Sequence, residues 1–162
     1  MAPMKNVAQP VFAAALLAAV PVLAHDAPQS SVHEAPGHGA SAGVPVAAAE
    51  ARRVVAISMD DSMRYDPAEI RAKPGEAVRI VATNRGKLMH ELVIGTRADL
   101  EAHAKHMREH PAMEHHGGNS LHVHPGETRA MGWRFTRRGE FLYGCLVPGH
   151  FEAGMVGKIV VE

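Results

Sequence analysis

Apolar and polar residues alternate through most of the chain after residue 51, and turn-forming Pro and Gly residues separate the alternating stretches. Alternation with a period of two is typical of β-strands that bury one face. Strand patterns of this kind cover residues 52–59, 68–72, 77–84, 90–96, 128–135, 141–145 and 155–162. About seven short strands in a domain of about 100 residues are typical of a β-sandwich, so we predict an all-β fold.

Residues 96–113 interrupt this pattern, because they lack β-branched side chains after Thr96 and are rich in Ala, Glu, Lys, Met and Leu. These residue types favour helices. Thr96 or Asp99 can cap the start of a helix, and Pro111 should end it. We therefore predict a short helix near residues 97–110, inserted between two strands and followed by a polar loop over residues 114–127.

Residues 1–24 have the pattern of a secretory signal peptide. Lys5 precedes an apolar run over residues 11–23, and the small-residue sequence Val-Leu-Ala ends at Ala24. The run is shorter than the ~20 residues that a membrane-spanning helix needs. We expect cleavage near Ala24, export to the periplasm and no membrane span in the mature protein, with an uncleaved membrane anchor as the alternative.

Residues 25–50 contain no aromatic residue, little periodicity and many Ala, Pro, Gly and Ser residues. Such a composition is typical of a flexible segment. We therefore predict a flexible leader that carries His25, His33 and His38. One folded domain follows it over residues 51–162.

The charge of the chain argues against a nucleic-acid partner, whereas its histidine content favours metal ions. The chain has 17 Lys and Arg residues, 17 Asp and Glu residues and a formal net charge of zero. The basic residues are scattered, so no basic face would attract nucleic acid. The 12 histidines, beside 9 methionines, are available as metal ligands at neutral pH.

Cys145 is the one cysteine of the chain. In an exported protein it has no partner for an internal disulfide, so it is either a buried core residue or a metal ligand. His150 and Met155 follow it at intervals of five residues, in a loop that Pro and Gly residues define, and His90 opens an earlier predicted strand. In a sandwich, that strand can start at the same end as the Cys145 loop, which would let all four side chains converge.

Two imidazoles, a thiolate and a thioether form the ligand set of blue-copper electron-transfer sites. Thiolate and thioether suit Cu(I), whereas imidazole tolerates both oxidation states, so the ion can change charge with little movement of its ligands. Metal binding also keeps the thiol ionised and protected. A zinc site is a weaker alternative, because a thioether is a poor zinc ligand.

Three stretches carry a resemblance to a known family. They are the sequence CLVPGHFEAGM from Cys145 to Met155, the upstream sequence NRGKLMHEL around His90, and the final GMVGKIVVE. On these motifs the chain resembles the cupredoxin family over residues 51–162. The resemblance implies a Greek-key β-sandwich and one type 1 copper ion bound by His90, Cys145, His150 and, axially, Met155.

One position departs from the family pattern. Azurin-like and plastocyanin-like cupredoxins usually carry a small polar residue after the first ligand His, and its side chain ties the two copper loops together. This chain has Glu91 there. Asn84 is our alternative candidate for the tether, and such outer hydrogen bonds tune a bound metal.

A histidine- and methionine-rich insertion, residues 101–124, lies between the predicted ligands His90 and Cys145. On a helix, several of its side chains would share one face, and His122 and His124 would share a face if extended. His and Met without nearby Cys suit copper better than a hard ion, although a merely solvated polar helix is the alternative. The predicted auxiliary copper ligands are His103, His106, Met107, His110, Met113, His115, His116, His122, His124 and, at the mature N-terminus, His25.

Two functions fit these features. The first is a periplasmic copper-tolerance protein with a type 1 site and auxiliary copper sites, because some cupredoxins with His/Met-rich extensions have this role and the chain resembles them. The alternative is a diffusible one-electron carrier between redox partner proteins. We do not expect an enzyme, because multicopper oxidases and nitrite reductases place histidine beside the ligand Cys, where this chain has Gly144 and Leu146. Slow oxidation of Cu(I) by the His/Met-rich insertion is the alternative to a protein without enzymatic activity.

Overall fold

The computed structural model describes residues 42–109 and 117–162, which belong to the unit Ala35–Glu162, one of two into which the chain divides. Several of the predictions fall outside the described residues. They are the signal peptide 1–24, most of the leader and the candidate ligands His25, His110, Met113, His115 and His116.

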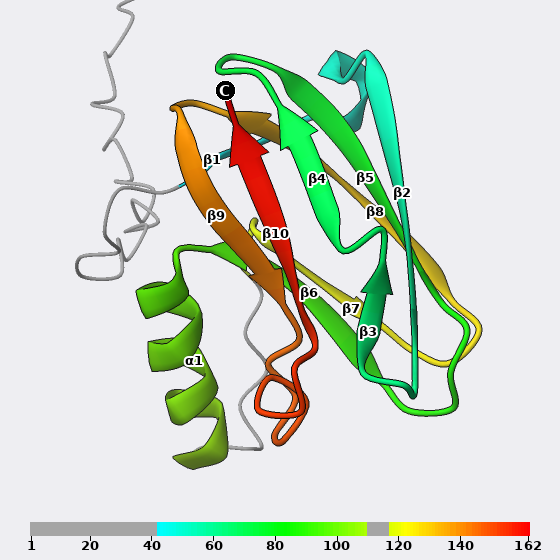
Figure 1. Cartoon of the computed structure of the whole chain (residues 1–162). Coiled ribbons are helices and arrows are strands. Elements are labelled where there is room, and N and C mark those ends of the chain that lie inside the picture. The colour runs from blue at the N-terminus through cyan, green and yellow to red at the C-terminus, as the bar shows by residue number, and fades with distance from the viewer. Residues whose placement is uncertain (1–41, 110–116) are drawn as a thin grey trace, which may run out of the picture. The chain divides into compact units, whose positions relative to one another are not determined.

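The described residues form two five-stranded sheets packed face to face (Figure 1). The first sheet has the order β1 (Gly43–Val46), β8 (Thr128–Phe135), β5 (Ala77–Asn84), β2 (Arg53–Asp60) and β3 (Arg64–Asp66). The second has the order β4 (Glu69–Ala72), β10 (Val156–Val161), β9 (Gly139–Gly144), β6 (His90–Gly95) and β7 (Ser120–Val123). The pairs β2–β5 and β4–β10 are parallel and the other pairs are antiparallel.

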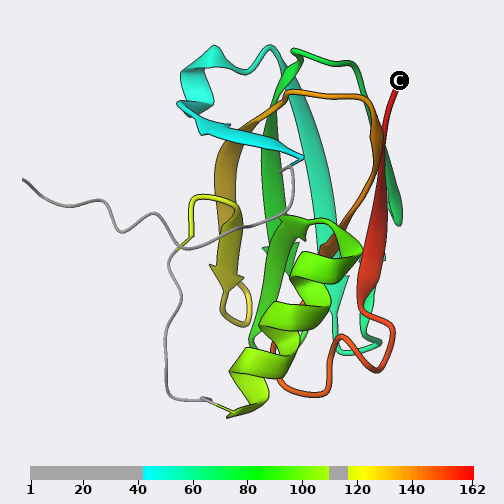
Figure 2. The ribbon, with the colours of Figure 1, turned by 90° about the vertical axis from the view of Figure 1, so that its left-hand side faces the viewer.

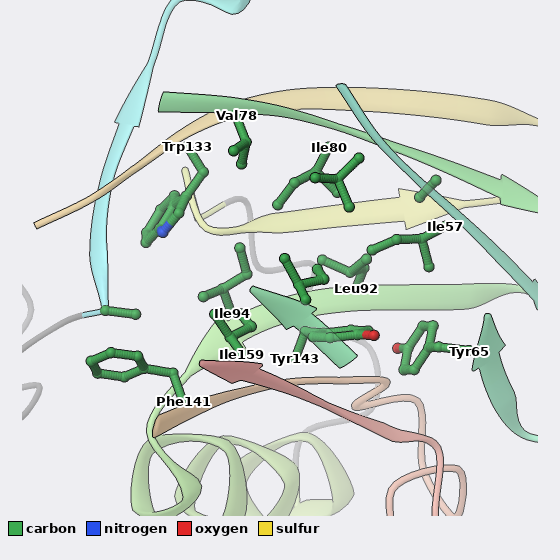
Figure 3. Packing of buried hydrophobic residues seen from close by; sticks show 14 of the residues in the cluster. Ile57, Tyr65, Val78, Ile80, Leu92, Ile94, Trp133, Phe141, Tyr143 and Ile159 are labelled. Carbon is green, nitrogen blue, oxygen red and sulfur yellow. The ribbon is translucent and has the colours of Figure 1, made fainter. Parts of the chain in front are cut away.

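A two-sheet sandwich with one short α-helix confirms the predicted fold class. The alternation seen in the sequence corresponds to the two faces of each strand. In β5, for example, Val78, Ile80 and Ala82 are fully buried, whereas Arg79 between them is exposed. Side chains such as Ile57, Leu92 and Tyr143 meet them from other strands and fill the space between the sheets (Figure 3). Their burial removes apolar surface from water and stabilises the fold.

The sandwich begins earlier than the predicted boundary at Ala51. Strand β1 pairs with β8, with Gly43 opposite Phe135 and Val46 opposite Gly132. A side chain at position 43 would not fit, because its Cβ would lie 2.0 Å from the carbonyl oxygen of Arg134. The glycine that makes the segment look flexible therefore permits the close approach of two strands. A short 3-10 helix, η1 (Ala48–Glu50), connects β1 to the next strand.

The structure also has a strand where the sequence suggested only a polar loop. Strand β7 pairs antiparallel with β6, with Glu91 opposite His122 and His90 opposite Val123. Val123 is fully buried, while the side chains before it are half-buried. The strand has few apolar residues because it lies at the edge of its sheet.

The predicted helix is α1 (Arg97–Glu109), which follows β6. Both candidate caps contribute, since the backbone N–H of Asp99 donates to the Thr96 hydroxyl (3.2 Å) and the N–H of Thr96 donates to the Asp99 carboxylate (3.1 Å). Figure 2 shows α1 running along the outside of the second sheet. Among the described residues, no helix is long and apolar enough to cross a membrane.

Candidate metal centre

Three neighbouring strands of the second sheet bring the predicted ligands to one end of the sandwich. His90 is the first residue of β6, Cys145 follows the last residue of β9, and Met155 precedes the first residue of β10. The register fixes this arrangement, because Gly144 of β9 lies opposite both Val93 of β6 and Val156 of β10. In Figure 1 the loop between β9 and β10 lies at the lower end of the sheet, beside the start of β6.

The ligand atoms of His90, Cys145 and His150 converge. Nδ1 of His90 lies 3.2 Å from Nδ1 of His150, and Sγ of Cys145 lies 3.3 Å from the same His150 atom. The three side chains form a group whose ligand atoms all lie within 4.8 Å of one another. His90 and Cys145 are buried, whereas His150 is partly exposed. The group is small enough to surround a single metal ion.

Met155 is fully buried beside this group. Its carbonyl oxygen accepts a hydrogen bond from the N–H of Cys145 (3.1 Å), and its own N–H donates to the carbonyl oxygen of His150 (3.0 Å). These two hydrogen bonds close the loop between β9 and β10 on itself. They hold Met155 close to Cys145 and His150, the two predicted ligands that precede it in the chain.

The Cys145 thiol sits in an environment that suits a metal-bound thiolate better than a free one. Burial raises the pKa of Cys145 to about 12, while the backbone N–H groups of Glu91 and Val147 act against this rise. The N–H of Glu91 lies 3.3 Å from Sγ. At neutral pH the thiol alone stays protonated, so ionising it requires a cation such as a thiophilic metal. The donor set of two imidazoles and a thiol, with a buried thioether beside them, fits copper.

Glu91 connects the two segments that carry the predicted ligands His90 and Cys145. Its carboxylate is buried, accepts a hydrogen bond from the N–H of Leu146 and lies 3.1 Å from Nδ1 of His122. Burial raises the pKa of Glu91, and the adjacent His122 limits that rise. The residue after the first ligand His thus reaches the residue after Cys145, even though it is a glutamate rather than a small polar residue.

Asn84 has a different role from the tether that the sequence suggested. Its amide nitrogen donates to the carbonyl oxygens of Leu88 (2.7 Å) and Val123 (2.9 Å), and its amide oxygen accepts from the N–H of Gly86 (2.8 Å). The side chain therefore shapes the turn that leads into His90 and fastens that turn to β7. None of these three hydrogen bonds reaches the loop between β9 and β10.

A carboxylate that sequence reasoning did not single out also contacts the group. Asp61, in the turn between β2 and β3, has Oδ1 3.3 Å from Nε2 of His90. Hydrogen bonds from the N–H groups of Lys87 and Leu88 lower the pKa of Asp61, so it carries a negative charge at neutral pH. No local motif marks Asp61, because it lies in a turn between two strands of the other sheet, 29 residues away from His90.

The described candidates for auxiliary ligands have several different surroundings. Met107 is buried with Leu100 and Ala104 on the face of α1 that packs against the sheet, whereas His103 and His106 are half-buried. His122 contacts Glu91, and His124 is exposed. Within the ranges 42–109 and 117–162, His90, Cys145 and His150 are the one group of three or more His, Cys, Asp or Glu side chains close enough to hold a metal.

Comparison with known proteins agrees with this geometry. The family described as "Copper binding proteins, plastocyanin/azurin family" matches residues 52–162. The copper-resistant cuproprotein CopI of Rubrivivax gelatinosus is 50% identical over 120 residues, which cover 74% of this chain and 73% of that protein. The protein of the same name from Pseudomonas aeruginosa is 33% identical and covers 82% of this chain and 89% of its own length.

A solved structure shows the same fold. Dithionite-reduced auracyanin from Roseiflexus castenholzii superposes with a TM-score of 0.59 at 19% identity, over 69% of this chain and 98% of the auracyanin. The family match spans strands β2 to β10 and all four predicted ligand positions. The chain therefore belongs to the plastocyanin/azurin family of copper-binding proteins, and it is a cupredoxin that resembles copper-tolerance proteins.

Proposed function

We propose that this protein is a periplasmic type 1 copper protein that cycles between Cu(II) and Cu(I) in copper tolerance. The observation that carries the proposal is the convergence of His90 Nδ1, His150 Nδ1 and Cys145 Sγ within 4.8 Å of one another. Two imidazoles and one thiolate, together with the thioether of Met155, would hold copper at this site. Copper bound there supplies the capacity to accept and release one electron.

The chain's own residues prepare the site for that chemistry. His90 and Cys145 are buried at the ends of paired strands, so their positions change little when a bound ion changes its charge. The N–H of Glu91 faces the sulfur and stabilises its negative charge. Burial of His90, Cys145 and Met155 keeps bulk water away from most of the site. Four protein ligands leave no open position for a substrate, which is why we do not propose an enzyme.

The copper-tolerance role is supported by the relatives named copper-resistant cuproproteins, one of them 50% identical over 120 residues. In this role the insertion binds surplus copper at auxiliary sites. His103, His106 and His124 are the described candidates, together with His25, His110, Met113, His115 and His116 outside the described residues. We give Met107 and His122 lesser weight as ligands, because Met107 packs in the core and His122 contacts Glu91.

A diffusible electron carrier is the second candidate. The observation that favours it is the partial exposure of His150, since the other three predicted ligands are buried. Electrons would pass through the His150 edge to a redox partner protein docked over it. This function needs one copper ion per chain and no auxiliary sites.

Copper stoichiometry separates the two functions. Removal of residues 101–124 would be a poor test, because it would delete most of α1 and strand β7. A better variant replaces His25, His103, His106, His110, His115, His116 and His124 by Gln and Met113 by Leu, while it keeps Met107 and His122. We expect the mature wild type to bind more than one copper ion and this variant to bind one. A single ion in both proteins would favour the electron carrier.

A matched control isolates the type 1 site in the same titration. Cys145→Ala should lose one copper ion from the wild-type total and keep the auxiliary ions. Equal stoichiometry in Cys145→Ala and the wild type would contradict the assignment of Cys145 as a ligand.

A further inference from the structure

We propose that Asp61 is a positioning residue of the copper centre, which orients the His90 ring and favours Cu(II) over Cu(I). The inference rests on the proposed type 1 site and adds to it a residue from the turn between β2 and β3. Three sets of contacts support it: those of the His90 ring, those of the turn before His90, and those of the neighbouring Asp60.

The two nitrogens of the His90 ring face different partners. Nδ1 lies 3.2 Å from Nδ1 of His150, on the side of the predicted ligands, whereas Nε2 lies 3.3 Å from Oδ1 of Asp61. A carboxylate accepts hydrogen bonds and does not donate them when it is ionised. The proton of a neutral His90 ring therefore belongs on Nε2, which leaves the lone pair of Nδ1 free for a metal ion. In this way Asp61 selects the tautomer that can bind copper.

The same carboxylate organises the backbone that carries His90. The N–H of Lys87 lies 2.9 Å from Oδ2 of Asp61, and the N–H of Leu88 lies 3.1 Å from Oδ1. Gly86 permits this arrangement, because a Cβ at that position would lie 2.1 Å from Oδ1. Asp61 thus organises the turn from Gly86 to His90 together with Asn84. Asp61 fixes both the ring of His90 and the peptide segment before it.

The adjacent Asp60 provides a matched comparison. Its carboxylate accepts hydrogen bonds from the N–H (2.9 Å) and the hydroxyl of Ser62, and these contacts stay within its own turn. Asp60 and Asp61 therefore carry the same charge next to each other, but only Asp61 contacts the His90 ring among the hydrogen bonds described for the two. If negative charge acts on the copper potential at long range, both residues should contribute. If it acts directly through the His90 ring, only Asp61 should contribute.

A carboxylate on the far nitrogen makes an imidazole ligand more basic and holds its orientation. Greater basicity stabilises the more highly charged ion, so Asp61 should strengthen the binding of Cu(II) relative to Cu(I). Loss of such a partner typically costs 10–100-fold in metal affinity. We expect the lower end of this range, because the Asp61 side chain is 38% exposed and water screens its charge.

The test measures the midpoint potential of the copper-loaded wild type, Asp61→Asn and Asp60→Asn. Asn keeps the size of the side chain and removes its charge. We expect Asp61→Asn to reduce the ratio of Cu(II) to Cu(I) affinity about tenfold, which raises the potential by about 59 mV for one electron. Asp60→Asn should leave the potential close to that of the wild type. Equal potentials in all three proteins, or equal rises in both variants, would overturn the proposal.

A second measurement needs no variant and no Cu(II). In the full-length wild type without copper, nitrogen-detected NMR of the His90 ring should show the proton on Nε2 and none on Nδ1 at neutral pH. A proton on Nδ1 would contradict the role of Asp61, whether or not Asp61→Asn folds. The proposed type 1 site is tested by a different result. It would be contradicted if the copper-loaded wild type had no thiolate-to-copper absorption band.

Discussion

Oε1 of Glu91 lies 3.1 Å from Nδ1 of His122, across the paired strands β6 and β7. The same carboxylate accepts a hydrogen bond from the N–H of Leu146, next to Cys145. One buried side chain therefore connects the first ligand strand, the Cys145 loop and the end of the histidine-rich insertion. The insertion is structurally joined to the metal centre, whatever copper it binds.

His122→Ala should destabilise the protein. The substitution leaves the buried Glu91 carboxylate without its His122 partner, and an unsatisfied buried polar group costs about 1–3 kcal/mol. Urea unfolding of the copper-free protein measures the change in the free energy of unfolding. His124→Ala is the matched control, because His124 is exposed on the same segment. Equal losses in the two variants would contradict the structural role of His122.

Leu100→Ala should be more damaging, because Leu100 joins α1 to the sheet. Its side chain is 1% exposed and clusters with Val93, Ala104 and Leu146. Truncation of a buried leucine to alanine typically costs about 2–5 kcal/mol. Leu88→Ala is the control, since the Leu88 side chain is 47% exposed and its loss should cost about 0.5 kcal/mol or less. Similar unfolding midpoints for both variants would show that α1 contributes little to the fold.

Asn84→Ala should also destabilise the copper-free protein. Asn84 is 1% exposed, and its side chain makes three hydrogen bonds that shape the turn before His90. Each such bond contributes about 1 kcal/mol, so we expect a loss of about 2–3 kcal/mol in the free energy of unfolding. Thr83→Ala is a suitable control, because the neighbouring Thr83 makes its hydrogen bond to Thr128 at the surface. A change in Asn84→Ala no larger than in this control would argue against the role of Asn84.

The copper-free protein should lose stability in alkaline solution because of Cys145. The folded thiol has a pKa raised by burial to about 12, whereas the ordinary value is 9.0. Between these values the unfolded chain gives up the proton and the folded protein keeps it. This contribution is therefore complete below pH 9 and decreases by about 1.4 kcal/mol per pH unit above it.

Cys145→Ala isolates that contribution. Other groups titrate in both proteins, so the difference between their slopes from pH 9 to 10.5 reports Cys145. We expect the wild type to lose stability more steeply with pH than the variant, as measured by urea unfolding at each pH. Parallel slopes would mean that the Cys145 thiol has an ordinary pKa in the folded protein.

The sequence predicted much of the fold because its main signals are local. Alternation along β2, β5 and β8 predicted strands close to their observed bounds, and Thr96 and Asp99 marked the start of α1. The three-residue strand β3 was not predicted, and neither were the weaker strands β1 and β7. The residues of β1 and β7 form strands because they pair with other strands of their sheets, and their own composition does not indicate it. Gly43, for example, pairs with Phe135.

In the metal centre, too, the residues of one local segment were predictable, whereas contacts between distant segments were not. The positions of Cys145, His150 and Met155 follow from one short loop, and His90 could be added because a sandwich allows its strand to start at the same end. Asp61 reaches His90 from the turn between β2 and β3, and no local pattern indicates such a contact. The roles of Glu91 and His122 were missed for a similar reason, since the contact depends on the register of β6 with β7.

The visible spectrum of the protein loaded with Cu(II) tests the central claim most directly. A type 1 site in which the Cys145 thiolate binds copper should give an intense thiolate-to-copper charge-transfer band. Cys145→Ala should abolish this band, whereas His124→Gln, which alters an exposed histidine, should retain it. A colourless wild type, or a band that survives in Cys145→Ala, would contradict the assignment of His90, Cys145, His150 and Met155 as a type 1 copper site.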